Sequence, residues 1–168
     1  MTALKWGLRA GTDNDYEFCK HIGHQGIKPY ISAYRPWDQA REDQGFQSIW
    51  QLPLISIIFV ERFPEANRAC SNSTLDSEST VVDIGFRIVN EDDDEIRLDG
   101  IYLAQHWRGK GIGTLVLRSL LEQATKPVRL RVFKNNPARR LYRRLGFRVD
   151  LNEDPQPDRW SMIYTNDL

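Results

Sequence analysis

The sequence predicts one domain over residues 1–168, of the α/β or α+β class, built around a sheet of mixed strand direction. The chain has 168 residues, which suits a single domain that can bury a sizeable core. Hydrophobic residues make up 40% of the chain and charged residues 27%, a composition typical of globular proteins. The expected elements come in the order strand, helices, three strands, helix, strand, helix and two strands. This order indicates a mixed sheet flanked by helices.

The N-terminal part of the chain predicts a strand and two helical stretches. The expected ranges are a strand over residues 4–9, a helix over 12–24 and a second helical stretch over about 30–50. Thr12 and Asp15 resemble the capping start of the first helix. Gly23 and Gly26 are expected to end that helix, and Pro36 to interrupt the second stretch.

The middle of the chain predicts three strands joined by two polar segments. The strands cover residues 54–60, 80–89 and 96–103, and the first is rich in β-branched residues. The segment from Arg62 to Ser79 is polar and long for a connection, so we expect a mobile loop or a lid. Residues 91–95 are all acidic and predict a charged hairpin turn, because they lack the spacing and the glycine of an EF-hand calcium loop.

The C-terminal part predicts a helix, a strand, a second helix and two further strands. The expected ranges are 111–124, 127–133, 136–145, 147–150 and 160–165. Val128, Leu130 and Val132 alternate with basic residues, as expected for a strand with one buried face. Asn136 before a proline predicts the start of the second helix, and Gly146 its end.

Cysteine content and hydropathy exclude several classes of protein. Cys19 and Cys70 are the two cysteines, too few for a disulfide framework and without the spacing of a Cys-x-x-Cys metal pair. The longest apolar stretch, residues 54–60, is far shorter than the roughly 20 residues of a membrane span. The first residues lack the basic head and apolar run of a signal peptide. We therefore expect a cytoplasmic protein with no membrane partner.

The charges are separated along the chain. Residues 1–100 contain 10 basic and 17 acidic residues, and residues 101–168 contain 13 and 6, so the halves carry net charges of −7 and +7. The basic half indicates either an anionic ligand or a solvated basic face. A nucleic-acid-binding module is an alternative, but it would need aromatic side chains between the arginines for base stacking. Because Phe133, Tyr142 and Phe147 are the few available, we expect no nucleic-acid partner.

A glycine-rich stretch between a strand and a helix is a candidate phosphate site. Gly109, Gly111 and Gly113 leave backbone N–H groups uncovered at the start of the helix, where a partial positive charge attracts anions. Arg108 and Lys110 add full positive charges. The stretch matches neither the P-loop nor the dinucleotide fingerprint. The alternative is a turn that only reverses the chain.

A second stretch, residues 135–147, contains Tyr142 near the middle of its predicted helix. This tyrosine is either a core residue or a site residue whose hydroxyl donates a proton. Together, the two stretches resemble the motifs of the GCN5-related N-acetyltransferase (GNAT) superfamily. The first motif, Arg/Gln-x-x-Gly-x-Gly/Ala, reads Arg108-Gly109-Lys110-Gly111-Ile112-Gly113. The second reads Asn135/Asn136-Pro137-Ala138-Arg139-Arg140-Leu141-Tyr142-Arg143-Arg144-Leu145-Gly146-Phe147, and the resemblance covers residues 80–165 firmly.

The resemblance implies a twisted, mostly antiparallel sheet of six to seven strands whose fourth and fifth strands, at 96–103 and 128–133, splay apart. It implies acetyl-CoA as the acetyl donor, with its pantetheine arm along residues 101–103 and its pyrophosphate on residues 109–114. The cofactor-binding residues it implies are Ile101, Tyr102, Leu103, Arg108, Gly109, Lys110, Gly111, Ile112, Gly113, Thr114, Asn135 and Asn136. Arg139, Arg140 and Arg143 are candidates for a further phosphate.

The resemblance also implies direct attack of a neutral amine on the thioester. Tyr142 would then protonate the leaving thiolate, and the Leu103 amide would donate to the developing oxyanion. The fifth strand lacks the carboxylate that serves as base in some relatives, so Asp99 is our candidate base. By simple alternation Asp99 shares the face of Ile101. The alternatives are an Asp99 paired with Arg97, a water relay, or a CoA-binding sensor without catalysis.

The acceptor is expected to be a small-molecule or peptide amine. Tyr30, Tyr34 and Trp37 are candidate substrate-binding residues, because an aromatic pocket in an acidic half suits a small cationic amine. The alternative is that these aromatics are core residues. His21 and His24 lack a third ligand, so no metal site is expected. A monomer and a homodimer both remain open.

Overall fold

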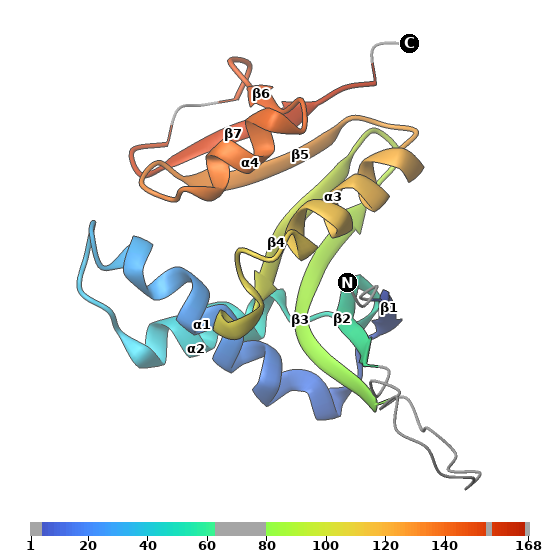
Figure 1. Cartoon of the computed structure of the whole chain (residues 1–168). Coiled ribbons are helices and arrows are strands. Elements are labelled where there is room, and N and C mark those ends of the chain that lie inside the picture. The colour runs from blue at the N-terminus through green and yellow to red at the C-terminus, as the bar shows by residue number, and fades with distance from the viewer. Residues whose placement is uncertain (1–4, 63–79, 154–155, 167–168) are drawn as a thin grey trace, which may run out of the picture.

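The computed structural model describes residues 5–62, 80–153 and 156–166, and its described strands form a single seven-stranded sheet (Figure 1). The strands are β1 (Lys5–Ala10), β2 (Ile55–Arg62), β3 (Thr80–Glu91), β4 (Ile96–Leu103), β5 (Val128–Phe133), β6 (Arg148–Val149) and β7 (Arg159–Tyr164). The helices are α1 (Tyr16–Ile31), α2 (Gln39–Ile49), α3 (Ile112–Gln123) and α4 (Ala138–Arg144). The strand order is β1-β2-β3-β4-β5-β7-β6.

The predicted mixed, mostly antiparallel sheet is confirmed. Every neighbouring pair of described strands is antiparallel except β4 and β5, which are parallel. Those two strands pair only where they begin, over Ile96–Leu98 and Val128–Leu130. Beyond this point they diverge, as Figure 1 shows. A sheet with its central pair open in this way exposes backbone groups and side chains of both strands.

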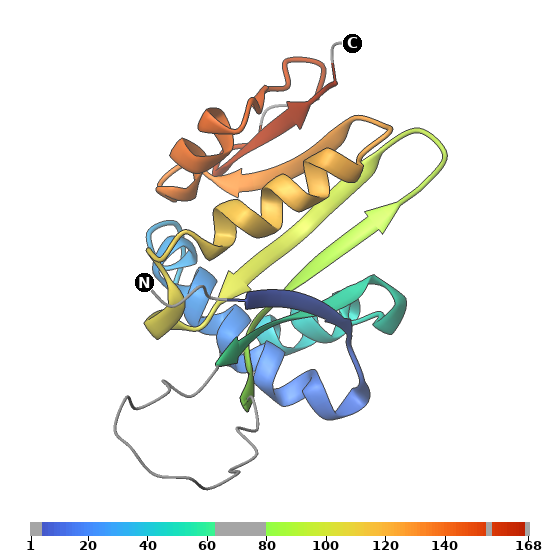
Figure 2. The same cartoon turned by 45° about the vertical axis from the view of Figure 1, so that its right-hand side comes forward.

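Helices cover the two faces of the sheet. On one face, α3 and α4 pack over β4 and β5, and Leu117 and Tyr142 share a buried cluster with Leu130. Figure 2 shows α3 over the front of the sheet, next to these strands. On the other face, α1 and α2 pack on β2 and β3, where Cys19 of α1 meets Phe86. The sheet is therefore buried on both sides near its centre.

A β-bulge in β4 changes which side chains face each helical layer. Val89 of β3 pairs with Leu98 and Ile88 pairs with Gly100, so Asp99 is the extra residue. After the bulge, Ile101 packs on the α3 face together with the cluster that contains Leu98. Simple alternation across Asp99 therefore fails, and the expectation that it shares the face of Ile101 is not met. The charges that act on Asp99 are those of Arg97 and Arg131, not groups beside Ile101.

The prediction that Gly23 and Gly26 end the first helix is wrong, because α1 continues through both to Ile31. These glycines allow close packing instead. A Cβ on Gly23 would lie 3.2 Å from the ring of Phe46, and one on Gly26 would lie 2.8 Å from the ring of Tyr102. The second helical stretch is also shorter than expected.

That second helix, α2, begins only at Gln39, where Asp38 accepts a hydrogen bond from the Arg41 amide at 3.1 Å. The acidic segment forms the β3–β4 turn, in which Asp92 Oδ1 accepts from the amides of Asp94 and Glu95.

Some expectations concern residues beyond the described ranges. The loop predicted over residues 62–79 falls outside them from residue 63 onward, as does Cys70. Within the described ranges, no group of histidine, cysteine, aspartate and glutamate side chains could hold a metal ion. No helix in the described part of the chain is long and apolar enough to cross a membrane.

Candidate functional site

A cavity of about 1150 Å³ occupies the divergence of β4 and β5. Its wall combines groups from both faces of the sheet. From the α3–α4 face come Gly109, Gly111, Gly113, Thr114, Asn136 and Tyr142. From β4 come residues 97–103, and from the opposite face come Ile27, Tyr30 and the arginines of β5. The cavity is large enough for a small organic ligand.

The glycine turn at the start of α3 is open toward the cavity. Gly109 and Gly111 have φ values of +74° and +82°, a conformation that side-chain-bearing residues rarely adopt. A Cβ at either position would meet no heavy atom within 4 Å, so unfilled space lies in front of the turn. The first N–H groups of α3 have no partner within the helix. Their geometry suits a bound phosphate.

Of the residues next to this turn, only some line the cavity. Arg108 lines the cavity, and its Nε donates to the Leu103 carbonyl at 2.8 Å. Lys110 does not line the cavity; its ammonium lies 5.0 Å from the centre of the Trp107 ring. Ile112 is 1% exposed and belongs to the core under α3. The cavity therefore brings together the glycines and Arg108, but not Lys110 or Ile112.

The backbone of β4 presents Leu103 to the cavity. The Ala104 amide bonds to the Ile84 carbonyl of β3, whereas the Leu103 carbonyl accepts from Arg108 on the other side. In an antiparallel ladder the N–H and C=O of one residue point the same way, so the Leu103 amide also faces the divergence. Ile101, two residues earlier, has the same orientation. The Leu103 amide and the Ile101 peptide groups are therefore available to a ligand that lies along β4.

Tyr142 projects from α4 into the cavity. The Asn136 side chain accepts a hydrogen bond from the Ala138 amide at 2.9 Å at the start of this helix, and Gly146 ends it with φ +94°. Tyr142 is 8% exposed, and its ring meets that of Phe147 edge to face. Burial raises the pKa of its phenol well above the usual value, with a smaller contribution from Tyr102. Its hydroxyl makes no hydrogen bond to any described residue.

Asp99 lies on the cavity wall at the bulge. Burial raises the pKa of its carboxyl, and the positive charges of Arg97 and Arg131 oppose that shift. Arg97 forms its ion pairs with Glu95 at 3.0 Å and Asp92 at 3.7 Å, and none with Asp99. Within the described ranges, the Asp99 carboxylate has no hydrogen-bond donor. It is a carboxylate without a structural partner beside the divergence.

The aromatic residues expected around the acceptor do not form one group. Tyr30 lines the cavity, and its carbonyl accepts from the Asn135 side chain at 3.3 Å. Tyr34 is 46% exposed and stacks on Phe133 with 6.4 Å between ring centres, outside the cavity. Trp37 also lies outside, where its Nε1 donates to the Gln39 side chain at 3.0 Å.

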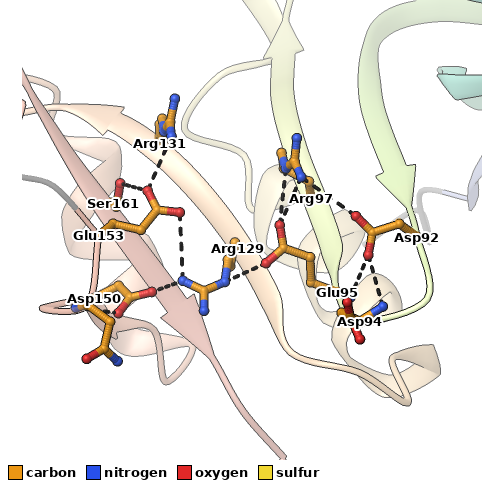
Figure 3. Close-up of polar contacts among 10 residues, drawn as sticks. Asp92, Asp94, Glu95, Arg97, Arg129, Arg131, Asp150, Glu153 and Ser161 are labelled. Carbon is orange, nitrogen blue, oxygen red and sulfur yellow. Dashed lines mark hydrogen bonds and ion pairs between the residues drawn. The ribbon is translucent and has the colours of Figure 1, made fainter.

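An arginine network on the face opposite α3 was missed by sequence reasoning (Figure 3). Arg129 of β5 forms ion pairs with Glu95, Asp150 and Glu153. Glu153 also accepts from Ser161 at 2.6 Å. Alternation in the sequence placed Arg129 on the polar face of its strand. The acidic partners lie far away along the chain, so no local pattern identified them.

Comparison with known proteins finds one matching family model and solved structures of similar fold. Residues 76–147 match the family model described as acetyltransferase (GNAT) family. No curated protein sequence matches the chain. The three solved structures described next are less than 25% identical to the chain, so their likeness shows the fold alone.

One such structure is the PaiA N-acetyltransferase from Thermoplasma acidophilum in complex with coenzyme A. It is 16% identical, with a TM-score of 0.60, and the match covers 95% of this chain and 98% of that one. The ribosomal-protein-S18-alanine N-acetyltransferase from Escherichia coli is 18% identical, with a TM-score of 0.59 and coverages of 98% and 99%. An acetyltransferase from Thermus thermophilus is 14% identical, with a TM-score of 0.63 and coverages of 98% and 99%.

Proposed function

We propose that this chain, whose residues 76–147 match the acetyltransferase (GNAT) family model, transfers the acetyl group of acetyl-CoA to a primary amine by direct attack. One observation carries the proposal. A single cavity joins the open glycine turn, the exposed edge of β4 and the Tyr142 hydroxyl. These would serve as a phosphate site, a site for an extended arm and a proton donor.

The residues present fit acetyl-CoA. The open space in front of Gly109 and Gly111 would hold the pyrophosphate on backbone amides, and Arg108 would add a positive charge. The Ile101 N–H and C=O would pair with the pantetheine arm. The similar structure from Thermoplasma acidophilum is a complex with coenzyme A, which supports acetyl-CoA as the donor. Three of the expected cofactor-binding residues do not line the cavity, namely Lys110, Ile112 and Asn135.

Acetyl-CoA would supply an activated thioester carbonyl and a thiolate leaving group. The Leu103 amide would donate a hydrogen bond to the carbonyl oxygen as negative charge develops on it. Tyr142 would protonate the sulfur; because burial raises the pKa of its phenol, it keeps its proton at neutral pH. Asp99, or a water relayed to it, would accept the proton from the amine. A carboxylate with a raised pKa is a stronger base than an exposed one.

Thermal unfolding with and without acetyl-CoA tests the binding step. A ligand that binds only the folded protein stabilises it by about 2.7 kcal/mol at a hundred times its Kd. We expect a clear rise in Tm, and release of free thiol when an acceptor amine is added. No rise in Tm for a folded protein would contradict the proposal. A rise without turnover across a broad amine panel would instead support a CoA-binding sensor.

A further inference from the structure

The cavity wall on the face opposite α3 is rich in guanidinium groups. Arg97 of β4, Arg129 and Arg131 of β5, and Arg159 of β7 all line it. They lie on this face because the alternate residues of β5, such as Leu130, are buried against α3. This wall lies across the divergence from the glycine turn. It is therefore the side from which an acceptor amine would approach the thioester.

Two of these arginines are occupied by structural partners. Arg129 holds Glu95 at 2.6 Å and the buried carboxylate of Asp150, with Glu153 at 3.8 Å. Arg97 holds the other oxygen of Glu95 at 3.0 Å. Figure 3 shows these groups as a row that joins the start of β4 to the start of β5. Their donors are committed to the fold.

The other two have donor capacity to spare. Arg131 is 59% exposed, and its carboxylate partner among the described residues is Glu153, at 3.3 Å through a single nitrogen. That glutamate already accepts a shorter bond from Ser161. Arg159 is 44% exposed and lies no closer than 3.8 Å to the carboxylate of Asp158. Five donors on each guanidinium leave most of them open to a ligand.

The surroundings of these two arginines are partly apolar. The Arg159 guanidinium lies over the Phe133 ring, 4.4 Å from its centre, and Tyr30 stacks on the same ring. Ile27 and Ile49 also line this side of the cavity. This side of the cavity therefore combines apolar surface with two guanidinium groups that have free N–H donors. It lies next to Asp99, which has no hydrogen-bond donor among the described residues. Planar guanidinium groups in such surroundings suit bidentate binding of carboxylate or phosphate.

We propose that the acceptor is a small amine that also carries an anionic group, a carboxylate or a phosphate, bound by Arg131 and Arg159. This inference rests on the proposed acetyl transfer and replaces the cationic amine expected from the aromatic residues. The new N–C bond forms as the C–S bond breaks. The amine proton passes to Asp99 or water, and the leaving thiolate takes its proton from Tyr142. With its anionic group held by Arg131 and Arg159, the acceptor would have its amine positioned where β4 and β5 diverge.

Matched acceptors test the charge requirement. An apolar α-amino acid is compared with its carboxamide and with the corresponding amine that lacks the carboxyl group, using thiol release as the readout. An aminoalkyl phosphate and an acidic peptide are assayed in parallel. We expect kcat/KM to be at least tenfold higher for the amino acid or the phosphate than for the neutral counterparts. Equal rates for the neutral amines, or acetylation of the peptide alone, would overturn the proposal.

Substitutions then locate the anion. Arg131→Gln and Arg159→Gln should each raise KM for the anionic acceptor about tenfold, whereas KM for acetyl-CoA stays unchanged. Arg131→Lys should recover part of the loss. Arg118→Gln, an exposed change on α3, is the matched control.

The change in Tm caused by acetyl-CoA shows whether the anion site alone or the proposed acetyl transfer itself is wrong. If the shift and neutral-amine turnover persist but the substitutions leave KM for the anionic acceptor unaltered, the anion site is wrong and acetyl transfer stands. If wild-type protein shows neither shift nor turnover, the proposed function itself fails. As a further check, KM of the anionic acceptor should rise with ionic strength, and a KM independent of salt would contradict the proposal.

Discussion

The Arg129 Nε of β5 lies 2.6 Å from a carboxylate oxygen of Glu95, immediately before β4. This contact joins the two strands at the end where they still pair. Arg129 also reaches Asp150, whose side chain is 3% exposed. Beyond Leu98 and Leu130 the strands no longer pair and they separate around the cavity. The closed end of the divergence is therefore held by charge as well as by backbone pairing.

Replacing Arg129 should destabilise the protein more than replacing an exposed arginine. Arg129→Gln leaves the buried Asp150 carboxylate without its cation, and breaking a buried pair costs about 3 kcal/mol. Urea unfolding measures the loss, and Arg118→Gln is expected to change the free energy of unfolding by less than about 0.5 kcal/mol. Equal effects of the two changes would show that the network contributes little.

Asp15 should make stability depend on pH in the acid range. Arg9 holds both Asp15 oxygens, at 2.7 and 2.9 Å, and keeps the pKa of that carboxyl well below its usual range. A lowered folded-state pKa contributes stability that is present above the unfolded pKa, about 3.9, and is lost as pH falls through the folded value. The difference in unfolding free energy between wild type and Asp15→Asn should narrow below about pH 4. A difference that is constant from pH 6 to pH 2 would exclude this linkage.

Tyr142→Phe should abolish most turnover and leave the fold intact. The hydroxyl makes no hydrogen bond to the described residues, so its loss should alter Tm little, while loss of a general acid lowers kcat about 100-fold. The acetyl-CoA shift in Tm should remain. Because burial raises the pKa of the phenol, ionisation of Tyr142 should not lower wild-type kcat below about pH 10. An active variant would remove Tyr142 from the mechanism.

Two glycine substitutions separate backbone strain from ligand binding. Gly111→Ala forces alanine into a positive-φ conformation at a cost of about 1 kcal/mol and places a methyl group in the space in front of the turn. We expect acetyl-CoA binding, measured by titration calorimetry, to weaken at least tenfold. Gly45→Ala in exposed α2 meets nothing within 4 Å and should stabilise the protein by about 0.5–1 kcal/mol with unchanged binding. Unchanged binding in Gly111→Ala would place the phosphate elsewhere.

Asp99→Asn tests the candidate base. If Asp99 accepts the amine proton, kcat should fall and the acid limb of the pH profile should change, because that limb reflects the raised pKa of this carboxyl. Asp99→Glu should retain part of the activity. An unaltered pH profile in Asp99→Asn would favour a water relay.

Local features of the sequence were sufficient for several elements. The observed bounds of β4, Ile96–Leu103, match the predicted range, because β-branched and alternating residues specify a strand within their own neighbourhood. The glycine turn, with its positive φ at Gly109 and Gly111, is also a local property. By contrast, Gly23 was misread as a helix end because its role depends on Phe46, which lies on another helix.

The sequence by itself determined the order of elements, the mixed sheet, the glycine turn before α3 and the position of Tyr142 on its helix. Each of these follows from residues that lie close together along the chain. The tertiary structure alone decided the bulge at Asp99, the exclusion of Tyr34 and Trp37 from the cavity and the division of the arginines into committed and available donors. These features depend on strand register and on side chains that meet across the sheet, and pairing between distant segments leaves no periodic signal in the sequence.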